Sequence, residues 1–271
     1  MTSQGAAAPL SERSLQEGKL QETLAQLQNQ VRAKPADGPL RVFLFQLLCV
    51  MGQWDRALNQ LQVLAGLDVN SEMLARIFQP VIQCEVLRGE VFSGNRTPII
   101  FGEPLEWVAL LIQANQMLAT GKVQAALELR DKAFDAAPAT AGKVNEQPFE
   151  WIADADQRLG PLLEVILEGR YYWVPFCRIK RIFMEKPADL RDMVWMPAQF
   201  VWANGGEAAG HIPTRYPGSH AAADDTLRLA RKTDWTETGE GFATGLGQRI
   251  LATNQAEYPL LECRIIDLAS G

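Results

Sequence analysis

The pattern of apolar residues divides the chain into two parts with different periods. In the first part, apolar side chains recur every three or four residues, the period of a helix that is buried on one face. After about residue 160 this period fades, and short runs rich in aromatic and β-branched residues follow, which predict strands. The predicted helices lie at residues 11–17, 20–33, 38–51, 54–65, 70–92, 104–119 and 122–136.

The predicted strands are short and are separated by Gly, Pro or charged residues. Regular short strands of this kind favour a small β-rich domain, either barrel-like or a curled sheet. We therefore expect an α+β fold: a disordered leader at residues 1–10, a helical domain at 11–145 and a β-rich domain at 146–271, with residues 138–147 as the linker. The strands are expected at residues 162–167, 171–174, 179–184, 192–195, 199–202, 208–212, 226–229, 249–252 and 261–266.

A repeat of about 34 residues is present in the helical part. Its copies begin at Gly18, Gly52 and Gly121, each followed by an apolar residue two positions on and a Leu six positions on. This pattern resembles tetratricopeptide repeats (TPRs), although the first copy has Thr23 where the others have Ala. Such repeats stack helical hairpins and leave a groove that holds a peptide or a helix. An irregular helical bundle with chance similarity is the alternative.

The apolar residues of this repeat are the expected helical core. Two of them in each copy are four positions apart, so they lie on one face of their helix. Leu24, Trp54, Leu58 and Leu127 are therefore expected to be buried at contacts between helices.

Charge and composition exclude several classes of function. The 271 residues carry a formal net charge of −6, and an acidic chain repels phosphate backbones, so we expect no nucleic-acid partner. No apolar run approaches the ~20 residues that span a bilayer, and the N-terminus does not read as a signal peptide, so we expect a cytoplasmic protein with no membrane partner.

The cysteines Cys49, Cys84, Cys177 and Cys263 lie far apart and are expected to be reduced and buried.

A search for catalytic or metal-binding chemistry finds weak candidates. His211 and His220, with Asp224 and Asp225, could supply four metal ligands, but their spacing matches no zinc signature. Ser219 precedes His220 without the G-x-S-x-G elbow of a nucleophile. We therefore expect no catalytic residue, no metal and no cofactor.

Two further motifs have simple structural interpretations. The glycine-rich stretches at residues 239–241 and 245–247 lead into a strand-like run, so they favour turns or a bulge over a phosphate-binding loop. Asp154 and Asp156, with Glu150 and Glu164 nearby, could be paired carboxylates for acid–base chemistry, but a cap or a solvated face is the simpler interpretation.

Aromatic and arginine side chains are concentrated in the β-rich part. Trp, Tyr and Arg dominate the hot spots of protein interfaces, and they are also ordinary components of small β cores. The candidate partner-binding residues are Arg215, Tyr216, Trp195, Trp235 and Arg249. The first two lie in a proline-bounded loop at residues 212–219. The alternative for Arg215 is an ion pair with Asp192 or Asp234 that pins this loop onto the sheet.

Several stretches resemble the ImpE family of type VI secretion accessory proteins, from about residue 10 to the C-terminus. They are PFEWIADAD (148–156), GRYYWVPF (169–176), DLRD (189–192), WMPA (195–198), IPTRYPGS (212–219) and GLGQR (245–249). The resemblance implies a non-catalytic cytoplasmic adaptor that binds the N-terminal helix of the small sheath subunit and, through it, assists sheath recycling by a AAA+ ATPase. A small-molecule enzyme in the β-rich half and a pure structural scaffold remain alternatives.

Overall fold

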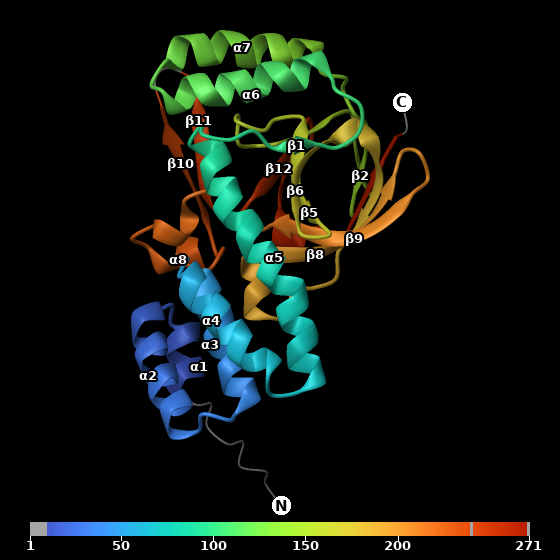
Figure 1. Cartoon of the computed structure of the whole chain (residues 1–271). Helices are drawn as coiled ribbons and strands as arrows, with labels where there is room; N and C mark the ends of the chain where they lie inside the picture. The colour runs from blue at the N-terminus through green and yellow to red at the C-terminus, as the bar shows by residue number, and fades with distance from the viewer. Residues whose placement is uncertain (1–9, 239–240, 270–271) are drawn as a thin grey trace, which may run out of the picture.

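The computed structural model describes residues 10–238 and 241–269, with helices in the first half and strands in the second (Figure 1). All seven predicted helices are confirmed, and their ends differ from the prediction by at most two residues. The predicted leader falls on residues outside the described part, except Leu10, which begins the first helix. The helices are α1 (Leu10–Gln16), α2 (Leu20–Ala33), α3 (Gly38–Val50), α4 (Trp54–Ala65), α5 (Val69–Phe92), α6 (Glu106–Ala119), α7 (Val123–Ala136) and the short α8 (Asp225–Arg228).

Most strands join one nine-stranded sheet in the order β1-β6-β5-β9-β8-β7-β14-β2-β3, antiparallel except for the β1–β6 pair. The sheet curls, but its edge strands β1 and β3 do not pair, so it is no closed barrel (Figure 1). The α+β class is confirmed. The strands are β1 (Ile99–Ile100), β2 (Gly142–Val144), β3 (Gln147–Phe149), β4 (Ile152–Asp154), β5 (Leu162–Leu167), β6 (Arg170–Pro175), β7 (Ile179–Phe183), β8 (Trp195–Trp202), β9 (Glu207–Pro213), β10 (Thr233–Glu237), β11 (Ala243–Gly247), β12 (Ile250–Thr253), β13 (Glu257–Pro259) and β14 (Ile265–Leu268).

Two predicted strands are helical turns, because aspartate side chains cap their backbone N–H groups. The stretch at 192–195 begins in a 3₁₀ turn, Leu190–Met193, and ends on the first residue of β8; in the turn, the Asp192 carboxylate accepts from the N–H groups of Ala188 and Asp189 at 2.8 and 2.9 Å. The stretch at 226–229 is α8, where Asp224 accepts from the Thr226 N–H at 2.8 Å. Such caps favour a turn over an extended strand.

The predicted linker at residues 138–147 is wrong. It contains β2 and reaches β3, and the two strands form a hairpin at the end of the nine-stranded sheet. Asn145 and Glu146 adopt positive φ angles of 46° and 74°, as a tight hairpin turn requires. The stretch predicted as one strand at 261–266 also divides, into a 3₁₀ turn and the beginning of β14.

The repeat glycines adopt the backbone conformation that their turn requires. Gly18, Gly52 and Gly121 have φ angles of +75°, +66° and +76°, which side chains other than glycine rarely adopt. The arrangement of the copies is a surprise, because the third copy (α6 and α7) lies at the opposite end of the molecule from α1 to α4, with α5 running between them (Figure 1).

Of the four large residues predicted to form the helical core, one is buried and three lie at its edge, next to buried alanines. Leu24 is buried, but Trp54, Leu58 and Leu127 are only partly buried, whereas Ala57 and Ala126 are fully buried. A small side chain lets two helices approach closely, so the contact line runs along the alanines, and the neighbouring large residues lie at its edge.

Helices and sheet share one hydrophobic core. Phe45 of α3, Phe78 of α5 and Trp195 of β8 form a chain of rings with centroid separations of 5.9 and 6.0 Å. A second core covers the other face of the sheet. The first core contains residues from both sides of residue 145, where the domain boundary was predicted.

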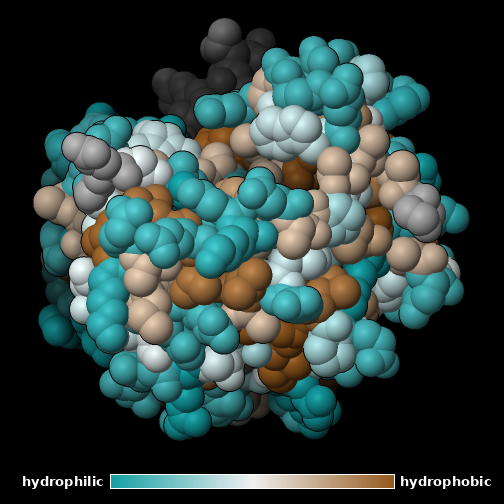
Figure 2. Space-filling view, turned by 90° about the horizontal axis from the view of Figure 1, so that it is seen from above, coloured by the Kyte–Doolittle hydropathy of each residue, from teal (hydrophilic) through white to brown (hydrophobic). Residues whose placement is uncertain are grey.

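The surface is mixed in character. Seen from the side of α6 and α7, apolar side chains form separate brown patches that polar side chains interrupt (Figure 2). Across the described residues, no helix has both the length and the apolar character that a membrane span needs.

Candidate functional site

A buried carboxylate lies where α5 crosses the sheet. Along β5, Leu162 and Ile166 belong to the core beneath the helices, whereas Leu163 and Val165 face the other core. Because side chains alternate along a strand, Glu164 points to the helical side, between Leu162 and Ile166. It is fully buried.

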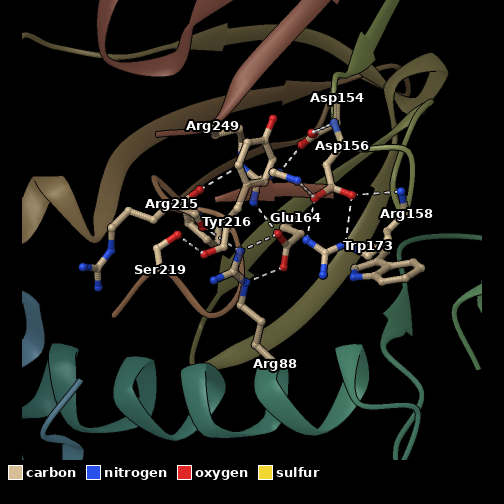
Figure 3. Close-up of polar contacts among 12 residues, drawn as sticks. Arg88, Asp154, Asp156, Arg158, Glu164, Trp173, Arg215, Tyr216, Ser219 and Arg249 are labelled. Atoms are coloured by element: carbon tan, nitrogen blue, oxygen red, sulfur yellow. Dashed lines mark hydrogen bonds and ion pairs between the residues drawn. The ribbon is translucent and has the colours of Figure 1, made fainter. Parts of the chain in front are cut away.

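Two arginines from distant parts of the chain meet Glu164 (Figure 3). Arg88 of α5 donates two hydrogen bonds to its carboxylate, at 2.6 and 2.8 Å. Arg249, just before β12, donates to the same carboxylate and to Asp154 of β4. The Tyr171 hydroxyl also donates to Glu164 and accepts from the indole N–H of Trp173 at 2.7 Å.

The charges of this cluster shift the pKa values of its acids in opposite directions. Burial alone would raise the pKa of Glu164, but Arg88 and Arg249 outweigh it and lower the pKa to about 2. Burial raises the pKa of Asp154 to about 6, because Arg249 only partly offsets it and the Asp156 carboxylate adds to it. Glu164 is therefore ionised at neutral pH.

The Asp154 and Asp156 carboxylates hold the neighbouring loop in place by hydrogen bonds. The Asp156 carboxylate accepts from the Arg158 side chain at 2.9 Å and from the Gly245 N–H at 2.8 Å. Asp154 accepts from the Asp156 N–H at 2.9 Å. Both carboxylates are buried, so the predicted solvated face is wrong, and each accepts from the backbone N–H two residues further on, as a cap does.

This cluster connects the two halves of the chain. Arg88 also donates to the backbone carbonyl of Arg215 at 2.7 Å, so one side chain of α5 holds both β5 and the loop after β9. Sequence reasoning placed Glu164 among candidate carboxylates but missed its arginine partners; the available signal is that Glu164 stands inside the apolar run LLEVIL. A buried charge requires a buried partner of opposite sign.

Four of the five candidate partner-binding residues lie inside the molecule. Arg215, Tyr216, Trp195 and Arg249 are between 0 and 3% exposed, so their side chains hold the fold together and do not form a free surface. Trp195 donates its indole N–H to Glu85 at 3.0 Å. The sequence could not place them, because aromatic and arginine residues are typical of interfaces and of small cores alike.

Arg215 ties the loop to the helices by an unexpected route. It does not pair with Asp192 or Asp234 but donates to the backbone carbonyl oxygens of Val50 at 2.8 Å and of Arg228. The Val50 carbonyl belongs to the last turn of α3, where carbonyls lack partners in the helix. Burial lowers the pKa of Arg215 to about 10, so the side chain still carries its charge at neutral pH.

Trp235 is the exception among the candidates. It lies on β10, is 40% exposed, and packs one side of its ring against Tyr216 at a centroid distance of 5.5 Å. It is the candidate that the structure leaves available to a partner.

The histidines pack against aromatic rings. The His211 ring meets Phe78 edge-on at 5.3 Å, and the His220 ring meets Trp54 at 5.7 Å. Burial, assisted by Arg191, lowers the pKa of His211 to about 4. Within the described ranges, no three His, Cys, Asp or Glu side chains are grouped as a metal site would need. All four cysteines are free thiols, and all but Cys177 are buried.

An open cleft lies between α5 and the sheet. Its volume is about 790 Å³, and it crosses four neighbouring strands, β5, β9, β8 and β7. At ~4.8 Å between strands, these span about 14 Å, the length of a helix of roughly nine residues. Its apolar lining includes Ile77, Phe78, Ile166, Phe183 and Met196.

The rim of the cleft carries charges of both signs. Arg76 and Lys186 lie there with Glu168, Glu185 and Asp189. On α5, the exposed side chains of Val69 and Met73 precede Ile77 at intervals of four residues, so an apolar stripe on one helix face leads into the cleft. An apolar floor with a charged rim is the arrangement that holds an amphipathic helix.

Comparison with known proteins gives a consistent result. The sequence profile of the ImpE protein family matches residues 146–267, and a tetratricopeptide-repeat profile matches residues 14–77. The chain is 47% identical to the type VI secretion system accessory component TagJ of Pseudomonas aeruginosa, over 97% of this chain and 92% of that protein. A crystal structure of a Vibrio parahaemolyticus protein matches with a TM-score of 0.88 at 25% identity, over 97% of this chain and 98% of that one.

Proposed function

Because the chain belongs to the ImpE family, we propose that it is a non-catalytic, cytoplasmic accessory protein of a type VI secretion system. In this proposal it is an adaptor that binds the N-terminal helix of the small sheath subunit and, through that subunit, assists sheath recycling by a AAA+ ATPase. The similarity to a named accessory component and the repeat-containing helical half both support an interaction role.

The observation that carries the proposal is the cleft between α5 and the sheet. Its apolar floor is about as long as two to three helical turns, and its rim can pair with charges of either sign on a bound helix. Since α5 forms one wall and the strands form the floor, both halves of the chain are needed to make it. We therefore expect neither half alone to bind the sheath subunit as tightly as the whole chain.

The cleft supports an adaptor better than an enzyme. Three of its titratable groups are engaged within the fold: the Arg191 guanidinium lies 2.5 Å from the Asp189 carboxylate, and Asp192 caps a turn. The low pKa of His211 would leave it a weak base at neutral pH, whereas general acid–base catalysis favours a pKa near the working pH.

The test is capture of the purified small sheath subunit by the full chain and by two matched variants. Ile77→Asp places a charge on the cleft wall, and Val86→Asp places the same charge elsewhere on α5, at a side chain of similar exposure (45% and 52%). We expect Ile77→Asp to weaken capture at least tenfold, an order-of-magnitude figure for a charge in an apolar contact, and Val86→Asp to leave it unchanged. Equal capture by both variants, at unchanged melting temperature, would exclude the cleft as the binding site.

A further inference from the structure

One strand of the β-rich half has a free edge. β10 belongs to a two-stranded sheet, and its partner within the described residues is β11 alone. Figure 1 shows β10 on the outside of the molecule, with β11 between it and the other strands. The five residues pair with β11 in an unbroken register, so no bulge disturbs the strand.

Hydrogen bonds of β11 show which backbone groups of β10 are free. Trp235 pairs with Gly245, and Thr233 pairs with Gly247. Gly245 donates its N–H to the Asp156 carboxylate and Gly247 donates to the Ser219 hydroxyl, both at 2.8 Å, so these two N–H groups point away from β10. In an antiparallel ladder, two residues directly opposite each other either both bond across the pair or both point away from it. Thr233 and Trp235, which lie opposite Gly247 and Gly245, therefore direct their N–H and C=O groups away from β11.

Every second residue of β10 therefore has unpaired backbone groups on the free edge. Thr233, Trp235 and, by the same alternation, Glu237 direct backbone donors and acceptors to the open side. Residues 234–237 are all exposed. β10 contains no proline, no lysine and no bulge, so its protection against pairing comes from its acidic side chains, Asp234 and Glu237, which repel acidic strands and not basic ones.

The charges around the edge indicate which partner fits. Lys232 pairs with Asp224 at 2.9 Å and with Asp234 at 3.1 Å, so the local cation is already engaged. Among the described residues, Glu237 forms no ion pair, and the whole chain carries a net charge of −6. An acidic edge favours a basic segment and disfavours a second, equally acidic copy of this chain.

We propose that the free edge of β10 binds an extended, basic segment of another protein, which adds to the β10–β11 sheet as a third strand. Main-chain hydrogen bonds to Thr233, Trp235 and Glu237 hold the segment. The exposed side of the Trp235 ring contacts an apolar side chain of the segment, and Glu237 pairs with a Lys or Arg. The cleft of the proposed function is not involved.

The test uses a synthetic peptide of alternating lysine and valine as the probe and measures amide hydrogen exchange and binding on the full chain. Trp235→Pro removes an outward N–H but no hydrogen bond to β11, and proline is tolerated at strand edges. We expect the peptide to protect the amides of residues 233, 235 and 237, and Trp235→Pro to weaken binding about tenfold. Trp235→Val keeps the backbone N–H donor and should therefore weaken peptide binding less than Trp235→Pro does.

A second variant keeps the proposal testable if the proline disturbs the hairpin. Glu237→Lys leaves the backbone unchanged. It should weaken binding of the lysine–valine peptide and strengthen binding of a peptide in which glutamate replaces each lysine. Protection of other residues only, or binding that neither variant changes, would overturn the proposal. So would a dimer of the chain itself that Trp235→Pro abolishes, because a second copy would then occupy the edge.

Discussion

At the scale of single residues, the unusual feature is one carboxylate shared by two guanidinium groups. Glu164 meets Arg88 and Arg249 where none of the three reaches water. Removing charges from water is costly, and the arrangement is stable only while each charge keeps its partner. The exposed ion pairs of this protein have water as an alternative partner and contribute little by comparison.

Glu164→Gln should therefore strongly destabilise the folded protein. It removes the carboxylate that the two buried arginines share, so that Arg88 keeps only Glu85 and Arg249 keeps only Asp154. We expect a loss of about 3–5 kcal/mol in the free energy of unfolding, which denaturant titration measures. The control is Asp267→Asn, which breaks the partly exposed Arg181–Asp267 pair of 2.5 Å and should cost far less. Similar losses in the two variants would contradict this account of the cluster.

His211 should make stability depend on pH. Its folded-state pKa is lowered from 6.5 to about 4, so the folded protein prefers the neutral ring. The stabilising contribution is complete above pH 6.5 and is lost as the pH falls toward 4. Between pH 7 and pH 4 the wild type should lose about 3 kcal/mol more of its unfolding free energy than His211→Asn. Parallel pH profiles of the two proteins would show that His211 titrates normally.

At the scale of elements, glycines determine how closely β11 packs. A Cβ on Gly245 would lie 2.2 Å from Cδ2 of Tyr216, so a side chain there would displace the ring. The ring in turn packs against Trp235 and donates its hydroxyl to the Ile250 carbonyl at 3.2 Å. The stretch at residues 245–247 is therefore part of a strand and not the predicted turn or bulge, and Gly245 makes room for the tyrosine ring. Of the other predicted stretch, 239–241, residues 239 and 240 lie outside the described residues.

A pair of alanine substitutions tests this assignment. Gly245→Ala should destabilise the protein by about 1–3 kcal/mol, because the new methyl group overpacks a rigid site. Gly89→Ala lies in α5 with nothing within 4 Å of the added Cβ, and it should stabilise by up to about 1 kcal/mol through helix propensity. Thermal unfolding of both variants measures the two changes in stability. If both variants were destabilised, or both stabilised, this assignment would be contradicted.

The elements differ in how well their sequences predict them. The helices could be predicted because their apolar period is sustained over many residues. Strands such as β10, with the sequence TDWTE, were missed because an exposed two-stranded hairpin has no buried face to produce alternation. The buried roles of Arg215 and Arg249 depend on contacts with residues 165 and 95 positions away, which no local pattern contains.

At the scale of the whole molecule, the two halves are joined by packing and by charge. The ring contacts around Phe78 and the hydrogen bonds of Arg88 and Arg215 all run from helices to the β-rich half. The helices give way to strands between Ala136 and Gly142, and the hydrophobic core continues across this change.

The chain should therefore unfold in one transition. Loss of the helices would expose the core face of β5 and β6, and loss of the sheet would leave Arg88 unpaired, so neither half keeps its stability alone. Circular dichroism at 222 nm and tryptophan fluorescence should give coincident denaturant curves. Two separated transitions would show that the halves are independent domains.

The shared carboxylate also restricts how this sequence can change during evolution. Replacing any one of Arg88, Glu164, Arg249 and Asp154 leaves a net charge in this buried group, whereas replacing all four with apolar residues of similar volume leaves none. Single-step substitution paths through these positions therefore pass through destabilised intermediates. The four codons are expected to vary together or not at all. A selection that randomises them jointly should recover two kinds of sequence, the charged set and a fully apolar set, and few sequences that mix the two.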